Sequence, residues 1–318
     1  MWMQALPRPC FPTDDMIRTR QQSLIYRAAK RLPGHLPWQS APALYRLTHP
    51  ETKASVKQLI KVFGEHFPDA SPQMVHQWAQ QHIDLQAWEL MDTMMLAQVG
   101  NPRRVALEVA GIEPLRRAVG TGQGIILIFN HVDRILGGGL AIARAGVPFH
   151  SLTMEIDDNA GLSSSEKAYL THKVSTFQRL SGGMALRRNA SMKRIYAGLA
   201  TGEVWSILAD AWHPSAKGKR AHNFLGRSLH LATGIERIAT ATGARMFQVT
   251  PFTRAPGLLE VQVRMLDTDP ETAVNQAIQN LAADISERPW AWWNWGLIDV
   301  MSEQRKNSPL KDRKKCHI

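Results

Sequence analysis

His131 lies just beyond a run of five apolar residues at positions 125–129. If this run is a buried strand of an α/β sheet, His131 lies at the carboxyl end of that strand, where such sheets bind their ligands. An imidazole at this position can serve as a general base near neutral pH. The alternative is that His131 only caps the strand, or the helix after it, through hydrogen bonds.

Three carboxylates are candidate partners for this imidazole. A carboxylate on the second ring nitrogen of a general-base histidine fixes the tautomer and stabilises the imidazolium. Asp133 is two residues away and reaches the ring only if the segment is a turn, because helical positions two apart do not face each other. Asp210 ends a second apolar run and reaches the ring only if the two strand ends are neighbours. We rank Asp133 first, Asp210 second and Glu155 third.

The elements that would position these residues are strands and helices that alternate from Val105 onward. Strands are predicted at 124–129, 205–209 and 246–250, with an edge strand at 259–265. Helices are predicted at 136–145, 165–180, 189–200 and 231–242. The pattern predicts an α/β fold with a central mixed β-sheet flanked by helices. The glycines at 137–139 lack the spacing of a phosphate loop, so we interpret them as close packing in a helix or turn.

The first hundred residues predict helices that are interrupted by prolines. Residues 16–31 have helical spacing and a basic face, residues 32–50 form a proline-rich connector, and a long helix begins after Ser71, which can cap it. We therefore divide the chain into a helical N-terminal region (1–104), an α/β core (105–300) and a basic C-terminal tail (301–318).

Composition limits the function classes. The chain has 318 residues and a formal net charge of +11, so it is long enough for a sizeable core and needs an anionic partner. It lacks nucleic-acid-binding motifs, which leaves an anionic membrane surface or an acidic carrier protein. Cys10 and Cys316 are its only cysteines, which excludes a disulfide framework and indicates a reducing compartment. No apolar run spans a bilayer or forms a signal peptide, so we expect a cytoplasmic protein.

Four tryptophans lie within six residues, at positions 290, 292, 293 and 295. Such a cluster is typical of a bilayer interface, although a core-closing segment is the alternative. We assign one or two of the rings to the core and the others to lipid or acyl-chain contacts. Together with the basic tail, they predict peripheral association with the inner membrane.

Short motifs follow one another in a characteristic order. They are Gly111-Ile112-Glu113-Pro114-Leu115, the strand that ends at Asn130-His131, Leu186-Arg187-Arg188, Leu199-Ala200-Thr201-Gly202-Glu203 before the strand ending in Asp210, Asn223-Phe224-Leu225-Gly226-Arg227, Ala239-Thr240-Ala241-Thr242-Gly243-Ala244, and Pro289-Trp290-Ala291-Trp292-Trp293. This ordered set resembles the bacterial lipid A biosynthesis acyltransferases, a branch of the lysophospholipid acyltransferase superfamily. The resemblance covers about residues 57–298 and rests on the order of the motifs.

The resemblance implies that His131 deprotonates an acceptor hydroxyl, which then attacks an acyl thioester of acyl carrier protein or coenzyme A. No bound cofactor is implied. The family's histidine is followed, after four residues, by Asp or Glu, and this chain has Leu136 at that position. The carboxylate must therefore come from elsewhere, and Asp133, Asp210 and Glu155 are the candidates.

The resemblance also implies binding residues. Arg188, beside Arg187, occupies the position at which the family has a basic residue near the acceptor's phosphate, and a guanidinium suits phosphate. Lys217, Lys219, Arg220 and Arg227 surround the stretch with Phe224 and would hold a phosphorylated sugar or a carrier's phosphopantetheine. The alternative for each is a solvated basic loop. His213 and His222 are too far apart, without nearby cysteines, to form a zinc site, and we predict no metal.

Two functions follow from these residues. The first is an acyltransferase at the inner membrane that acts on a hydroxyl or amine of a lipid or other amphipathic acceptor. Family members commonly have an N-terminal membrane anchor, which we do not find, so the acceptor is expected to be less hydrophobic, or the transferred group to be aminoacyl. The second, motivated by Leu136, is a catalytically silent protein that binds a membrane or an acyl carrier with the same cleft.

Overall fold

A mixed seven-stranded sheet forms the centre of the computed structural model, which describes residues 20–157, 162–213, 216 and 218–302. Its strands run in the order β1-β9-β8-β2-β5-β3-β4, and only the β8–β9 pairing is antiparallel. The bounds are β1 Ala106–Ala110, β2 Ile125–Phe129, β3 His150–Thr153, β4 Ala185–Arg187, β5 Val204–Leu208, β8 Arg245–Ala255 and β9 Leu258–Met265, and a separate hairpin is formed by β6 Lys219–Phe224 and β7 Arg227–Ala232. The predicted α/β fold with a mixed sheet is confirmed.

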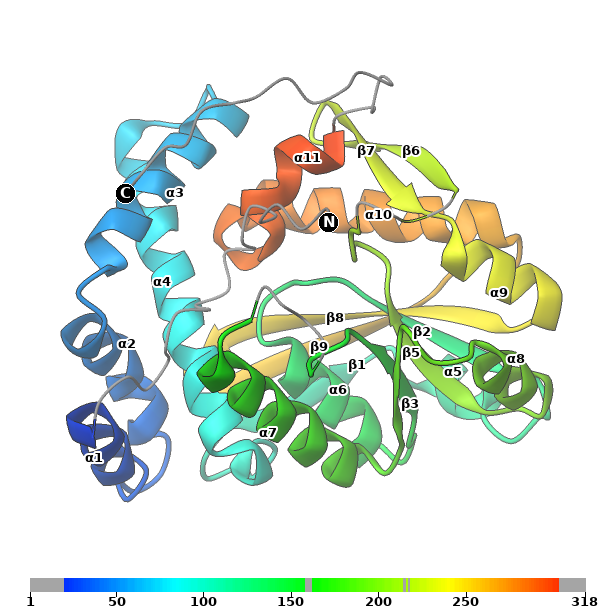
Figure 1. Cartoon of the computed structure of the whole chain (residues 1–318), viewed down its shortest axis with the longest axis horizontal. Helices are drawn as coiled ribbons and strands as arrows, with labels where there is room; N and C mark the ends of the chain where they lie inside the picture. The colour runs from blue at the N-terminus through cyan, green and yellow to red at the C-terminus, as the bar shows by residue number, and fades with distance from the viewer. Residues whose placement is uncertain (1–19, 158–161, 214–215, 217, 303–318) are drawn as a thin grey trace.

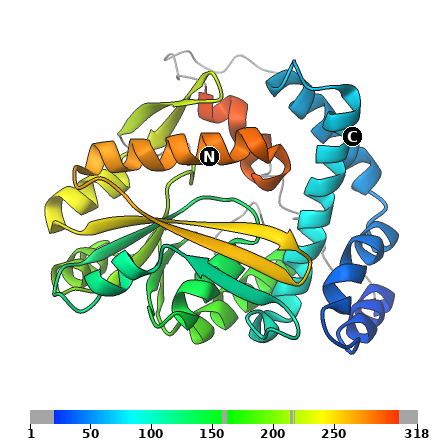
Figure 2. The same ribbon diagram turned by 180° about the vertical axis from the view of Figure 1, so that it is seen from behind.

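Helices cover both faces of this sheet (Figure 1). Helices α6 and α7 lie on one face, and α10 crosses the other, as the reverse view also shows (Figure 2). The bounds are α5 Glu113–Ala118, α6 Ile135–Arg144, α7 Ser164–Ser181, α8 Lys193–Ala200, α9 Gly234–Thr242, α10 Pro270–Glu287 and α11 Ile298–Ser302, with short 3-10 turns η1 Leu96–Gln98, η2 Pro289–Ala291 and η3 Asn294–Leu297. The predicted strands and helices of the core all have counterparts here.

The glycines of α6 allow the helix to pack closely. A Cβ atom on Gly137 would lie 2.5 Å from Leu259 Cδ2, and one on Gly139 would lie 2.5 Å from Phe177 Cζ. All three glycines are buried. The interpretation of this stretch as close packing is confirmed.

The prediction that 259–265 is an edge strand is wrong. Strand β9 pairs antiparallel with β8 and parallel with β1, which covers its outer side. Its side chains alternate between buried and half-buried positions because its two faces differ in burial. Alternation reports the faces of a strand and says nothing about its edges.

The N-terminal helices are α1 Arg20–Ala29, α2 Leu36–Thr48, α3 Thr52–His66 and α4 Pro72–Met94. Ser71 caps α4 by accepting the backbone N–H of Met74 at 3.2 Å, as predicted. The predicted connector at 32–50 is wrong, because most of it is α2. Pro42 inside α2 removes one helical hydrogen bond, and the carbonyl of Trp38 accepts Trp88 Nε1–H at 3.0 Å instead.

A buried ion pair joins these helices to the core. Arg134, three residues after His131, donates through Nε and Nη2 to the Asp92 carboxylate of α4, both at 2.6 Å. Trp38 of α2 donates to the same carboxylate at 2.7 Å. Both charged side chains are fully buried. The N-terminal helices therefore contact the loop that carries His131.

Candidate active site

His131 and Asp210 meet at the carboxyl edge of the sheet. Strand β2 pairs in parallel with β5, and the register sets Phe129 opposite Leu208. His131 and Asp210 each follow two residues later, and Asp210 Oδ1 lies 2.9 Å from Nδ1 of the imidazole. The Asp210 side chain is fully buried, whereas the His131 side chain keeps 20% of its surface exposed. The imidazole is therefore accessible from outside while its carboxylate partner is not.

N–H donors surround the Asp210 carboxylate. The backbone N–H of His131 donates to its two oxygens at 3.0 and 2.9 Å. Trp292 Nε1 and Asn294 Nδ2 donate to Oδ2 at 2.9 and 3.1 Å. Such an environment suits an ionised carboxylate, which can only accept hydrogen bonds. Nδ1 of the neutral imidazole therefore carries the hydrogen, and Nε2 carries the lone pair.

Asp133, ranked first as the partner of the imidazole, binds other groups. Its Oδ1 accepts the backbone N–H of Arg134 at 2.8 Å and the hydroxyl of Thr253. Its Oδ2 accepts the backbone N–H of Thr253 and Arg288 Nη1, both at 2.9 Å. The backbone does turn at Asp133, where φ is 53°, but the turn directs the carboxylate to β8. The ranking was wrong, and the contact expected of Asp133 is made by Asp210.

Residues 288–295 hold the loop that carries the imidazole. The backbone N–H of Asp133 donates to the carbonyl of Ala291 at 2.7 Å, and that of Trp293 donates to the carbonyl of His131 at 2.9 Å. Arg288 adds its ion pair with Asp133. A segment more than 150 positions away in the sequence therefore fixes the backbone on both sides of Val132.

The assignment of only one or two rings of the tryptophan cluster to the core is wrong, because three of them are buried. Trp292, Trp293 and Trp295 are at most 1% exposed, and only Trp290 is half-buried. Each buried indole N–H has an acceptor inside the protein: Asp210 for Trp292, the carbonyl of Asp133 for Trp293 and the carbonyl of Pro289 for Trp295. These rings therefore do not need the polar surroundings of a bilayer interface.

Two of the predicted binding residues lie around the loop that follows Asp210. Arg188 Nη2 lies 3.1 Å from Glu155 Oε2 and 3.2 Å from His213 Nε2. Burial raises the pKa of Glu155, but hydrogen bonds from its own backbone and from Arg188 outweigh this effect and lower that pKa overall. Burial and the charge of Arg188 lower the pKa of His213. Lys219 Nζ lies 5.1 Å from the centre of the Trp212 ring. Glu155, the third-ranked acid, is thus a partner of Arg188.

The other predicted binding residues have separate surroundings. Arg187 pairs with Asp157 at 2.5 Å. Arg227, at the turn of the β6–β7 hairpin, pairs with Asp299 at 3.4 Å. Phe224 is fully buried, with its ring centre 4.9 Å from that of Trp292, so it packs behind the site. Lys217 lies outside the described residues.

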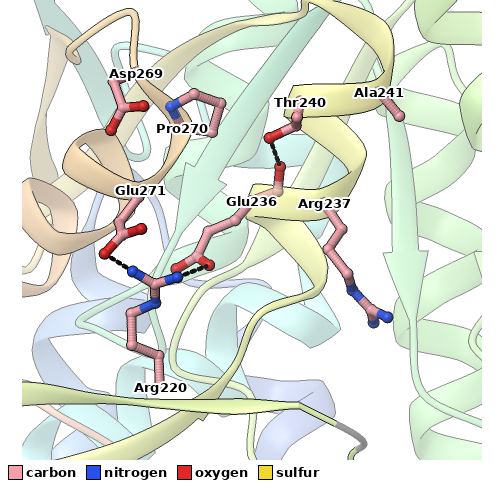
Figure 3. Close-up of a pocket in the computed structure, with 8 residues that line it drawn as sticks. All are labelled: Arg220, Glu236, Arg237, Thr240, Ala241, Asp269, Pro270 and Glu271. Carbon is pink, nitrogen blue, oxygen red and sulfur yellow. Dashed lines mark hydrogen bonds and ion pairs between the residues drawn. The ribbon is translucent and has the colours of Figure 1, made fainter.

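Arg220 lies at a different place, in an open pocket of about 410 Å³ bordered by α9 and the beginning of α10 (Figure 3). Its guanidinium lies between the carboxylates of Glu236, at 3.4 Å, and Glu271. Burial raises the pKa of Glu236. Two acids thus surround Arg220, which argues against its predicted role in holding phosphate.

Comparison with sequence models of known protein families gives a match that includes this site. The sequence model of the family described as bacterial lipid A biosynthesis acyltransferase matches residues 43–295, which include His131, Arg188 and Asp210. The chain belongs to this family. The lipid A acyltransferase family indicates acyl transfer in general, with an acyl thioester as co-substrate. No curated protein matches the chain.

Membership of the lipid A acyltransferase family agrees with the resemblance seen in the motifs. Within the described ranges, no helix is long and apolar enough to cross a membrane. In the same part of the chain, no group of three or more His, Cys, Asp or Glu side chains is arranged to hold a metal ion.

Sequence reasoning missed two residues at the site, Trp292 and Asn294. Trp292 was considered only as an aromatic ring, although its indole N–H binds the Asp210 carboxylate. Asn294 was not considered at all. The signal that could have found it is its position as the one polar side chain between Trp290 and Ile298.

Proposed function

We propose that the chain is an acyltransferase in which His131 is the general base and Asp210 orients and stabilises its imidazole. The observation that carries the proposal is the 2.9 Å contact between His131 Nδ1 and the buried Asp210 carboxylate at the carboxyl edge of the sheet. This pairing supplies the acid that the family's usual position, here Leu136, does not provide. The proposed site therefore keeps a dyad although its local motif is altered.

The proposed reaction is the attack of an acceptor hydroxyl or amine on the carbonyl of an acyl thioester. Nε2 of His131 takes the acceptor's proton as the new bond to the carbonyl carbon forms, and Asp210 stabilises the imidazolium. The carbon–sulfur bond then breaks, and the imidazolium returns the proton to the leaving thiolate. The products are the acylated acceptor and the free thiol, and His131 regains its neutral form.

The proposed donor is the thioester of acyl carrier protein or coenzyme A, and the acceptor is a lipid or other amphipathic molecule that carries an anionic group. Arg188 and Lys219 are the proposed anion-binding side chains, because both lie around the loop after Asp210. The Arg188 side chain is 46% exposed, so its guanidinium is accessible to an anionic group of a substrate. Arg187, Arg227 and Phe224 stay predictions for contacts with substrate.

We infer that the protein works at an anionic membrane surface in the cytoplasm. Support comes from its net charge of +11 and from exposed leucines on the N-terminal helices. Leu24, Leu36 and Leu47 are each more than 40% exposed, and Arg27 and Arg46 are exposed on the same two helices. Apolar side chains beside basic ones suit the boundary between headgroups and acyl chains. The C-terminal tail invoked in the same prediction lies mostly outside the described residues.

Turnover of acyl thioesters tests the proposed function. Purified protein is incubated with acyl carrier protein or coenzyme A thioesters and an extract of anionic lipids, and loss of thioester and appearance of acylated product are measured. We expect transfer that falls by about 10² to 10⁴ in His131→Ala, because general-base catalysis contributes that much. No turnover above background in wild type would favour the silent binding protein, and equal turnover in wild type and a folded His131→Ala would remove His131 from the mechanism.

A further inference from the structure

Within the described part of the chain, the buried Asp210 carboxylate is held by neutral hydrogen-bond donors rather than by a cation. Its donors are neutral, and two of them come from residues more than eighty positions later in the chain. Asn294 also donates to the backbone carbonyl of Asp210 at 3.1 Å and lies 3.3 Å from Nδ1 of His131. One amide group therefore contacts the acid's side chain, the acid's backbone and the imidazole.

We propose that Trp292 and Asn294 are positioning residues that hold Asp210 and thereby keep His131 in the tautomer with hydrogen on Nδ1. This inference rests on the proposed function, because it assigns how the same dyad is oriented. Neither residue is at the position of the family's acid, and neither was expected to have a polar role.

The packing around Trp292 fixes the direction of its N–H. Its ring centre lies 4.9 Å from that of Phe224 and 5.1 Å from that of Trp295, and the side chain is fully buried. Asn294 is 2% exposed. A carboxylate held by two fixed donors cannot rotate away from the imidazole, and preorganisation of this kind spares reorganisation during the reaction.

The neutrality of these donors has a chemical consequence. Both Trp292 and Asn294 hold the carboxylate without cancelling its charge, so the charge stays available to the imidazolium that forms during proton transfer. A lysine or arginine at either place would reduce that stabilisation. The nearest cation in the same segment, Arg288, pairs with Asp133 instead.

Two substitutions remove the donors with little change in shape. Trp292→Phe keeps an aromatic ring and loses the N–H, and Asn294→Leu keeps the branched arrangement of side-chain heavy atoms and loses the amide. Trp295→Phe is the matched control, because it removes an indole N–H of the same segment that binds the carbonyl of Pro289 rather than Asp210.

The imidazole tautomer can be measured by nitrogen-15 NMR of histidine-labelled protein, with the His131 signals identified by their loss in His131→Gln. We expect the Nδ1–H tautomer in wild type and in Trp295→Phe, and a mixture of tautomers in Trp292→Phe and Asn294→Leu. An Nε2–H tautomer in wild type, or the wild-type tautomer in both folded test variants, would overturn the proposal. If a variant does not fold, the wild-type spectrum still tests the proposal, because an Nε2–H tautomer there overturns it.

Kinetics separate this proposal from the proposed function. In Trp292→Phe we expect kcat to fall about tenfold with KM for the thioester unchanged, the size of one lost hydrogen bond to a charged group. The acidic limb of the pH–rate profile should move to lower pH, because a carboxylate that can rotate away from the imidazole stabilises the imidazolium less. If the tautomer changes in Trp292→Phe and Asn294→Leu but neither wild type nor any variant transfers an acyl group, the proposed function is rejected and the positioning role is retained. Unchanged kcat and pH profile in Trp292→Phe would reject the positioning role.

Discussion

Two carboxylates flank the His131 loop, and their partners separate their roles. Among the described residues, Asp210 contacts the imidazole and otherwise only neutral donors. Asp133 binds Arg288 and two groups of Thr253, so it fixes the loop to β8 and to the segment that follows α10. We therefore propose that Asp210 acts with His131 in the reaction, whereas Asp133 holds the backbone of the loop in place.

His82 predicts a pH dependence of stability. It is fully buried, with Nδ1 2.8 Å from the carbonyl of Trp290, and burial lowers its pKa from 6.5 to about 4. Below pH 6.5 the unfolded chain binds a proton that the folded protein excludes, so stability is complete above pH 6.5 and falls as the pH falls toward 4. We expect His82 to account for about 2 kcal/mol of the loss between pH 7 and pH 5.

Urea unfolding at the two pH values measures this effect, and His82→Gln, which keeps a donor for the Trp290 carbonyl, is the comparison. The variant should lose less stability than wild type on acidification. An identical loss in both proteins would show that His82 is protonated equally in the folded and unfolded states.

Sequence proximity favoured the wrong carboxylate for a physical reason. Asp133 lies near His131 along the chain, but the direction of its side chain depends on Thr253 and Arg288, which arrive from distant segments. Asp210 is adjacent only because β2 and β5 are neighbours in the register Phe129 to Leu208. Both strands were predictable from their apolar runs, whereas their order in the sheet was not.

At the scale of elements, α4 is tied to the core by a charge pair that water does not reach. Asp92→Asn leaves Arg134 buried without its counter-charge, so we expect the free energy of unfolding to fall by about 3–5 kcal/mol. Asp84→Asn on the same helix is the control. Its partner Arg46 is 38% exposed, and loss of such a pair changes stability by about 1 kcal/mol or less. Equal effects in denaturant unfolding would contradict the buried connection.

Two glycines in helices predict opposite effects of substitution by alanine. Gly64 lies exposed within α3 with nothing within 4 Å of an added Cβ, so Gly64→Ala should stabilise the protein by about 0.5–1 kcal/mol. Gly137→Ala in α6 should destabilise it, because its Cβ meets Leu259 at 2.5 Å. Thermal unfolding of both variants tests this: the midpoint should rise in Gly64→Ala and fall in Gly137→Ala. A lower midpoint for Gly64→Ala would contradict the placement of Gly64 at an exposed position within a helix.

Helix prediction failed where tertiary contacts compensate for proline. Periodicity identified α4 and the core helices α6 to α9 but not α10, and the cap at Ser71 is local chemistry that sequence shows directly. The prolines of α2 indicated a connector. The helix persists because Trp88 satisfies the carbonyl that Pro42 leaves without its helical donor, and no local pattern contains that contact.

At the scale of the molecule, the division into a helical region, a core and a tail stays a prediction. Asp92 and Trp38 belong to the first region and contact Arg134 in the second. The overall α/β class followed from the alternation of runs after Val105. The burial of the tryptophan cluster did not, because aromatic composition alone cannot distinguish a bilayer from a protein interior.

Membrane association predicts salt-sensitive binding to anionic vesicles. Each basic group near such a surface contributes about 1 kcal/mol, and salt screens this attraction. We expect co-sedimentation with anionic vesicles at low salt, release at high salt, and little binding to neutral vesicles. Absence of binding at low salt would refute the association, and binding that ignores salt would indicate hydrophobic insertion instead.

The central claim is that His131 and Asp210 act as one catalytic unit, and a double-mutant comparison of kcat tests it most directly. His131→Ala, Asp210→Asn and the double variant are assayed for acyl-thioester turnover, with folding checked by circular dichroism. We predict that Asp210→Asn reproduces most of the loss in His131→Ala, because a neutral amide at position 210 cannot fix the tautomer or stabilise the imidazolium. The double variant should be no slower than His131→Ala. Near-wild-type kcat in a folded Asp210→Asn, or losses that multiply in the double variant, would contradict the account.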